Sequence, residues 1–289
     1  LFFSTGYMAN LAAVGSLGNR NSIIFSDKLN HASLNEAAIL SRAKLLRYNH
    51  LDLNHLENLI KGSLIKRKII VTDGVFSMDG DIADIPGLVY LCEKYHASLY
   101  IDDAHGYGVL GSSGQGILEY YEDQGLISNQ SKNFIIYMFT LGKSIGVSGA
   151  MLCAKKEVIE YCIQKSKPYI YTTAAPPYIA SGAITSMNII KNDIRLRKKL
   201  NSLIELFRLK IFNKSTLTSS KTAIQPIVIN DLKKAISISS QLLKLGFLVP
   251  VIRPPTVPAG TSRLRVSISA LHTKKDIISL ASTINALLI

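Results

Sequence analysis

Lys143 is the residue of this chain that is best placed for carbonyl chemistry. It follows the apolar run Phe134–Met138 and is flanked by glycines, so its amine is expected at the end of a buried strand. A lysine amine in such a place can bond covalently to a carbonyl carbon. Two other interpretations stay open. One is an ordinary solvated lysine, and the other is a phosphate-binding nucleotide loop, although Tyr137 replaces a glycine that this loop requires.

A carboxylate and an imidazole form a second group with chemical potential. Asp102 ends the strand pattern Ser98–Ile101, and His105 follows three residues later in a glycine-rich loop. The carboxyl ends of strands in an open α/β sheet are where ligands bind. The loop also matches the dinucleotide pattern GxGxxG, but Asp-Asp-Ala-His separates its glycines from the strand and no helix start follows them directly. A capping aspartate and a surface histidine remain the alternative.

The lysine and the carboxylate together suit one kind of cofactor. Pyridoxal phosphate is held covalently by a lysine amine and needs an acidic partner for its pyridinium nitrogen. Lys143 and Asp102 are of the two residue types required, and both are expected at strand ends. The sequence therefore favours pyridoxal phosphate as the cofactor.

The phosphate group of that cofactor needs hydrogen-bond donors. Gly6 and Tyr7 precede the apolar helical run Leu11–Leu17, so their free amides are expected at a helix N-terminus. Thr140, three residues before Lys143, adds a hydroxyl group. We expect these residues to form the phosphate site.

Strand and helix patterns alternate in the part of the chain that carries these residues. The short β-rich runs are Ser22–Phe25, Lys68–Thr72, Ser98–Ile101, Asn133–Phe139 and Ala150–Ala154. Helical patterns between them include Ser33–Arg42, Leu53–Ile60 and Asp84–Tyr95. This alternation predicts an α/β fold with a mixed, mostly parallel sheet.

A long helical pattern, Tyr178–Phe212, leads to a smaller second part. This part is expected to contain strand Gln225–Ile229, helix Leu232–Leu245, strands Phe247–Val251 and Leu264–Ser269, and helix Lys274–Leu288, which Thr273 and Asp276 are expected to cap. We therefore expect a large cofactor-binding domain over residues 1–190, which includes the start of the connecting helix, and a small C-terminal α+β domain over residues 191–289.

Composition excludes several classes of protein. The chain has 289 residues, of which 47% are hydrophobic, so it can bury a substantial core. No apolar run approaches the ~20 residues of a spanning helix, and we expect no membrane segment. The net charge of +13 is spread over many segments, which favours anionic small molecules over nucleic acid. Three cysteines without a CxxC pair predict a cytoplasmic protein without a structural metal.

Several motifs resemble the α-oxoamine synthases, pyridoxal-phosphate enzymes of fold type I. They are Asp27–Ser33, Thr72–Asp81, Asp102–Gly106 and Thr140–Lys143. The resemblance extends along the whole chain, and it implies a PLP-dependent acyltransferase with that fold. It also implies a homodimer.

Two further segments, Tyr171–Pro177 and Arg253–Arg265, look most like the biotin-pathway branch of the family. That resemblance implies decarboxylative condensation of L-alanine with a pimeloyl thioester, carried on coenzyme A or on acyl carrier protein. Glycine C-acetyltransferase and 5-aminolevulinate synthase share the core motifs and are the alternatives.

The resemblance assigns roles around the cofactor. Lys143 holds it and later removes the Cα proton of alanine, while Asp102 keeps the ring nitrogen protonated. His31 stacks on the ring and contacts the substrate, a role that rests on the family pattern alone. His105 and Ser77 hydrogen-bond the phenolic oxygen.

The resemblance also assigns substrate contacts and exposes two departures. Arg265 binds the alanine carboxylate through a bidentate fork, and Thr256 lies at the substrate edge of the site. Asp73 stands where the family often has glutamate, which puts an acid role there in doubt. Family members also carry a longer segment before the point that matches Leu1. We therefore expect a missing N-terminal segment, and a truncated chain without catalytic activity is the second hypothesis.

Overall fold

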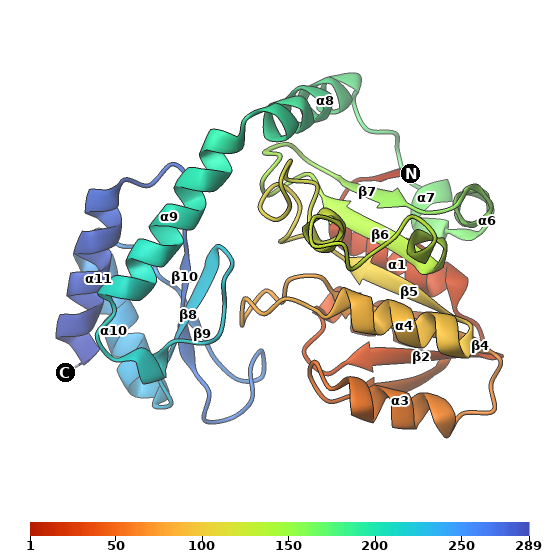
Figure 1. Cartoon of the computed structure of the whole chain (residues 1–289), viewed down its shortest axis with the longest axis horizontal. Coiled ribbons are helices and arrows are strands. Elements are labelled where there is room, and N and C mark those ends of the chain that lie inside the picture. The colour runs from red at the N-terminus through yellow and green to blue at the C-terminus, as the bar shows by residue number, and fades with distance from the viewer. Residues whose placement is uncertain (289) are drawn as a thin grey trace. The chain divides into compact units, whose positions relative to one another are not determined.

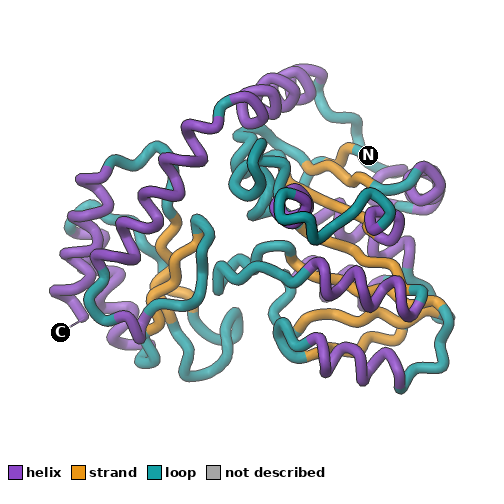
Figure 2. Tube along the Cα trace, viewed as in Figure 1, coloured by secondary structure: helices purple, strands orange, loops and turns teal. Residues whose placement is uncertain are grey.

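The computed structural model describes residues 1–288, and they form two compact units (Figure 1). Unit 1 comprises Leu1–Phe76 and Ala83–Asn192, and unit 2 comprises Ser77–Ile82 and the chain from Asp193 onward. Helices and strands alternate along unit 1, whereas unit 2 combines a small sheet with three long helices (Figure 2). The loop Ser77–Ile82 therefore groups with residues far from it in sequence.

Unit 1 is built on a seven-stranded sheet in the order β1-β7-β6-β5-β4-β2-β3. The strands are β1 (Phe2–Phe3), β2 (Ser22–Asp27), β3 (Lys44–Tyr48), β4 (Arg67–Asp73), β5 (Ala97–Asp102), β6 (Ile135–Thr140) and β7 (Ala150–Cys153). Strands β2 to β6 run parallel, and β7 is antiparallel to both β6 and β1. The predicted α/β fold with a mixed, mostly parallel sheet is confirmed.

The helices of unit 1 include several that start at a residue whose side chain caps the first turn. The helices of this unit are α1 (Gly6–Leu17), α2 (Ala32–Leu40), α3 (Leu53–Lys61), α4 (Ile85–Tyr95), α5 (Ile117–Glu122), α6 (Lys156–Lys165), α7 (Lys167–Ile170) and α8 (Pro177–Asn192), with a 3-10 turn η1 (Ser131–Phe134). Thr5, Asp52 and Asp84 accept hydrogen bonds from first-turn amides of α1, α3 and α4, which satisfies donors that lack a helical partner.

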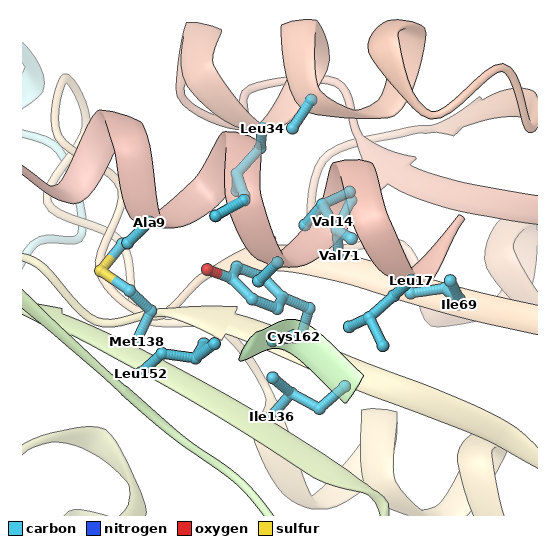
Figure 3. Close-up of a cluster of buried hydrophobic side chains, with 14 of the residues drawn as sticks. Ala9, Val14, Leu17, Leu34, Ile69, Val71, Ile136, Met138, Leu152 and Cys162 are labelled. Atoms are coloured by element: carbon cyan, nitrogen blue, oxygen red, sulfur yellow. The ribbon is translucent and has the colours of Figure 1, made fainter. Parts of the chain in front are cut away.

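The core of unit 1 lies against both faces of the sheet. On one face α1 packs its small residues over side chains such as Val71, Met138 and Leu152 (Figure 3). Alternate residues of the same strands, including Ile70 and Leu99, point to the other face and are also buried. Burial on both faces is typical of parallel sheets and leaves the strand ends for the site.

Unit 2 contains a three-stranded antiparallel sheet in the order β8-β10-β9. Its elements are α9 (Ile194–Lys210), a 3-10 turn η2 (Lys214–Thr216), β8 (Ile224–Val228), α10 (Leu232–Lys244), β9 (Val251–Ile252), β10 (Arg263–Ser267) and α11 (Lys274–Leu288). The loop Ser77–Ile82 is fixed within this unit, because Arg263 forms an ion pair with Asp79 and Thr222 donates to the carbonyl of Gly80 at 3.2 Å.

Two sequence predictions in unit 2 had different outcomes. The expected strand Phe247–Val251 is wrong, because only β9 pairs, after a left-handed Gly246 and after Pro250, which lacks an amide for a ladder. The predicted cap of α11 is confirmed, since the Thr273 amide donates to Asp276 at 2.8 Å and the Asp276 amide donates to Thr273 at 3.2 Å. Within residues 1–288, no helix has both the length and the apolarity to cross a membrane.

Candidate active site

Three neighbouring strands place polar side chains at one edge of the sheet in unit 1. Asp73, Asp102 and Thr140 are the last residues of β4, β5 and β6, and Asp73 pairs in register with Asp102. The carboxyl ends of parallel strands meet at the same edge, so the fold assembles a polar site from buried apolar strands.

Lys143 and His105 meet at this edge. Lys143 lies in the loop after β6 and His105 in the loop after β5, and their Nζ and Nε2 atoms are 2.9 Å apart. Lys143 is exposed, so its amine is accessible to a carbonyl group. The contact lets the imidazole share a proton with the amine.

Asp102 is buried and held from two sides. Asn10 donates to Asp102 Oδ2 at 2.7 Å, and the Ala104 amide donates to Oδ1 at 3.0 Å. Burial raises the pKa of Asp102, whereas these hydrogen bonds and the charge of Lys143 oppose that rise. The carboxylate form is therefore stabilised by specific partners inside an environment that disfavours it.

Asp73 adds a second buried carboxylate next to Asp102. Burial raises the pKa of Asp73 well above its usual value, and the charge of Asp102 raises it further. Its Oδ2 accepts from the backbone amide of His31 at 2.8 Å, so it fixes the residue that caps α2. Two adjacent carboxylates favour a positively charged ligand group near them, as a pyridinium nitrogen would be.

The N-terminus of α1 is the place where a phosphate site was predicted, and its geometry suits an anion. The amides of Gly6 and Tyr7 lie in the first turn, where they have no helical acceptor. A Cβ on Gly6 would fall 2.5 Å from Thr140 Cγ2, so only glycine leaves this approach open. Thr140 Oγ1 is buried and has no hydrogen-bond partner among the described residues. An unsatisfied hydroxyl beside free amides fits a bound phosphate group.

These observations show that the residues fit pyridoxal phosphate. Lys143 would supply the amine, Asp102 the carboxylate for the ring nitrogen, and Gly6 with Thr140 the phosphate contacts. Within residues 1–288, no cluster of three or more His, Cys, Asp or Glu side chains is arranged to hold a metal ion. The sequence prediction of a cofactor site at these strand ends therefore agrees with the chemistry of the donors present.

Three predicted site residues belong to unit 2 instead. Ser77 and Arg265 contact each other, because Arg265 Nε donates to the Ser77 carbonyl at 2.6 Å. Arg265 is partly buried, and burial lowers the pKa of its guanidinium. Thr256 is exposed in the loop before β10. The structure thus brings together the predicted residues of unit 1, and separately pairs Ser77 with Arg265.

Several buried polar residues that contact or adjoin the predicted site residues were not predicted from the sequence. Asn10 contacts Asp102, Ser33 contacts His31 at 2.7 Å, and Asp103 is buried next to Tyr137. The available signal was polarity, since Asn10 interrupts the apolar helix α1. The sequence pattern alone does not indicate which buried polar side chain Asn10 would contact.

Comparison with known proteins shows the family of the chain. The model of the aminotransferase class I and II family matches residues 1–284. An 8-amino-7-oxononanoate synthase of Methylobacillus flagellatus is 50% identical over 288 residues, covering 99% of this chain and 71% of that protein. The enzyme of the same name from Nitrosomonas europaea is 46% identical over 288 residues, covering 99% and 72%.

Two solved structures are similar to this chain in fold and in sequence. A serine palmitoyltransferase variant from S. paucimobilis, with a bound PLP–myriocin aldimine, has a TM-score of 0.90 and 30% identity and covers 99% of this chain and 71% of its own. An 8-amino-7-oxononanoate synthase from Francisella tularensis has a TM-score of 0.86 and 32% identity, covering 100% and 82%.

A sheet of this topology with a lysine and a carboxylate at its strand ends defines a pyridoxal-phosphate enzyme of fold type I, the class that the aminotransferase class I and II family represents here. Within that class, the chain belongs to the 8-amino-7-oxononanoate synthases, the PLP-dependent acyltransferases of biotin biosynthesis. The resemblance that its motifs carry is confirmed.

Proposed function

We propose that this chain condenses L-alanine with a pimeloyl thioester, carried on coenzyme A or acyl carrier protein, and releases carbon dioxide and the free thiol of the carrier. The observation that carries the proposal is the contact of Lys143 with His105 beside the buried Asp102, in a chain that belongs to the 8-amino-7-oxononanoate synthases. A homodimer in the cytoplasm is part of the same proposal.

Pyridoxal phosphate, when bound, supplies an aldehyde for amine attachment and a ring that withdraws electrons from the adjacent carbon. The chain supplies the rest. The Lys143 amine holds the cofactor and then takes the Cα proton of alanine, and His105 at 2.9 Å accepts or returns a proton at Nζ. The Asp102 carboxylate balances positive charge at the ring nitrogen, and His31 covers one ring face.

The substrate contacts belong to unit 2. We assign Arg265 to the carboxylate of alanine, because its Nε is committed to the Ser77 carbonyl and this bond fixes the plane of the guanidinium group. Thr256 is assigned to the edge of the substrate site. We assign the Ser77 hydroxyl, together with His105, to the phenolic oxygen of the cofactor.

The test is deuterium exchange into alanine together with product mass. The purified chain with pyridoxal phosphate should exchange the alanine Cα proton in deuterated buffer and, with pimeloyl-coenzyme A, form a product of the mass of 8-amino-7-oxononanoate. Asp102→Asn should slow the exchange at least about tenfold, since one charge-assisted contact of ~1.5 to 3 kcal/mol is lost. Lys156→Ala is the control, because Lys156 is a solvated lysine of α6.

Two results would reject the proposal. One is unchanged exchange in Asp102→Asn. The other is faster condensation of glycine with acetyl-coenzyme A than of alanine with pimeloyl-coenzyme A, which would move the chain to another branch of the α-oxoamine synthases.

A further inference from the structure

Asn10 is the centre of a buried hydrogen-bond network behind the site. It lies one turn into α1 and only 1% of it is exposed. Its Nδ2 donates to Asp102 Oδ2 at 2.7 Å and to Ser33 Oγ at 2.8 Å, and its Oδ1 accepts from the Tyr100 hydroxyl at 2.8 Å. Both N–H donors of this side-chain amide and one lone pair of its oxygen are therefore used.

The network fixes which way the amide of Asn10 faces. Burial raises the pKa of Tyr100 well above its usual value, so its phenol keeps the proton and donates it to Oδ1. A flipped amide would turn Oδ1 toward the Asp102 carboxylate and Nδ2 toward the phenol. That arrangement would remove the donor from a buried carboxylate, which is more costly than losing a neutral hydrogen bond.

The same network reaches His31 through Ser33. Because Ser33 Oγ accepts from Asn10, its proton is available for His31 Nδ1, 2.7 Å away. The Ser33 backbone amide also donates to Nδ1, at 3.3 Å. Two donors directed at Nδ1 make it an acceptor, and the neutral imidazole then carries its proton on Nε2.

We propose that Asn10 is a positioning residue that presents Asp102 as a carboxylate and, through Ser33, orients His31 with its ring proton on Nε2. The proposal rests on the cofactor roles assigned above to Asp102 and His31. Asn10 shares α1 with Gly6, so one helix links the phosphate site, the ring-nitrogen carboxylate and the stacking imidazole. Tyr100 acts indirectly, because its hydrogen bond to Oδ1 prevents the side-chain amide of Asn10 from flipping.

The first test reads the His31 ring without any cofactor. In protein labelled with ¹⁵N-histidine, the His31 signals are identified by their loss in His31→Gln, and they should show a protonated Nε2 and a hydrogen-bonded Nδ1. In Ser33→Ala the Nδ1 resonance should move toward that of an acceptor nitrogen without a hydroxyl partner. A protonated Nδ1 in the wild-type chain, or an unchanged resonance in Ser33→Ala, would overturn the inference.

The second test measures alanine Cα-proton exchange in the loaded enzyme, per folded molecule. Asn10→Asp keeps the shape and the acceptor for Tyr100 but loses both N–H donors, so exchange should fall about tenfold or more, the effect of one lost hydrogen bond to a charged group. Tyr100→Phe should cause a smaller fall in the exchange rate, and this variant replaces Asn10→Asp in the test if Asn10→Asp does not fold.

A buried asparagine elsewhere provides the matched control. Asn285 of α11 accepts from the Phe212 amide at 3.0 Å and donates to the Lys210 carbonyl at 2.8 Å, inside unit 2. Asn285→Ala should lower thermal stability and leave exchange per folded molecule unchanged. Wild-type exchange in folded Asn10→Asp would overturn the inference. A wild-type chain that exchanges nothing would instead reject the proposed function, and the imidazole signals would then decide the inference alone.

Discussion

At the scale of single residues, two consecutive aspartates have different surroundings. Asp102 accepts from Asn10 and the Ala104 amide. Asp103 Oδ2 accepts instead from the Tyr137 hydroxyl at 2.5 Å and the Ile117 amide at 2.8 Å. A Cβ on Gly106 would fall 2.1 Å from Asp103, so the loop that carries His105 is packed on this carboxyl group. Burial raises the pKa of Asp103 to about 7.

This pKa predicts a pH dependence of folding stability. The folded-state value of about 7 exceeds the ordinary value of 3.8, so the stabilising contribution is complete below pH 4 and is lost as the pH rises through 7. Asp103→Asn should therefore reduce the fall in the free energy of unfolding between pH 5 and pH 8, by at most about 3 kcal/mol. Urea unfolding of the cofactor-free chain at both pH values measures this.

Asp276 gives the control for that experiment. The hydrogen bonds from Thr273 lower the pKa of Asp276, so its contribution is present above its unfolded pKa and is lost only as the pH falls through the folded value. Asp276→Asn should leave the slope between pH 5 and pH 8 unchanged. An equal change of slope in both variants, or none in Asp103→Asn, would contradict the assignment.

The site residues differ in how well the sequence predicted them. Residue type and the end of an apolar strand pattern sufficed to place Asp102 at the end of β5 and Lys143 just after β6, because both signals are local. Their roles toward the cofactor stay a prediction. The contact between Asn10 and Asp102 joins residues 92 positions apart, and no local pattern encodes such a contact. The buried polar partners therefore became visible only in the folded chain.

At the scale of elements, α1 carries the proposed phosphate site at one end, and its buried residues pack in the core of unit 1. It contains two glycines with different surroundings. A Cβ on Gly6 would meet Thr140 at 2.5 Å, whereas a Cβ on Gly15 would find ordinary contact with Leu40 at 3.6 Å. Substitution of Gly6 therefore tests the proposed phosphate-binding role of α1, whereas substitution of Gly15 tests only its packing.

Gly6→Ala should weaken pyridoxal phosphate binding by about tenfold or more, because the added methyl group displaces Thr140 and the first-turn amides. Gly15→Ala should keep the affinity and raise stability by up to about 1 kcal/mol through helix propensity. Cofactor titration followed by absorbance, with thermal unfolding of both variants, tests the pair. Equal affinity in Gly6→Ala and the wild-type chain would remove α1 from the phosphate site.

Elements with strong periodicity were predicted and those without it were missed. Helices α3, α4 and α11 were expected within one residue of their observed bounds. Strand β3 was not identified, because Lys44 and Arg47 interrupt its apolar pattern and it lies at the sheet edge. The parallel pairing of β3 with β2 makes this segment a strand, although its own apolar pattern is interrupted.

At the scale of the whole molecule, the assigned roles are divided between two units. Lys143 and Asp102 belong to unit 1, while Arg265 and Ser77 belong to unit 2. The α/β fold class followed from the alternation of patterns. The grouping of Ser77–Ile82 with unit 2 did not, because it depends on contacts between distant residues, among them the ion pair between Asp79 and Arg263, which are 184 residues apart.

This division predicts that cofactor attachment and alanine binding respond to different substitutions. Arg265→Lys should raise the alanine dissociation constant about tenfold or more, since lysine cannot form the bidentate fork, and should leave cofactor attachment unchanged. Arg195→Lys, at an exposed arginine of α9, is the control. Alanine titration by absorbance decides it, and normal alanine affinity in Arg265→Lys would withdraw the carboxylate assignment.

The central claim is that Lys143 holds the cofactor, and peptide mapping after borohydride reduction tests it most directly. The chain is loaded with pyridoxal phosphate, reduced, digested and analysed by mass spectrometry. We expect one modified peptide, with the cofactor fixed on Lys143, and no fixed cofactor in a folded Lys143→Ala variant. A cofactor fixed on another lysine of the wild-type chain, or retained in Lys143→Ala, would contradict it.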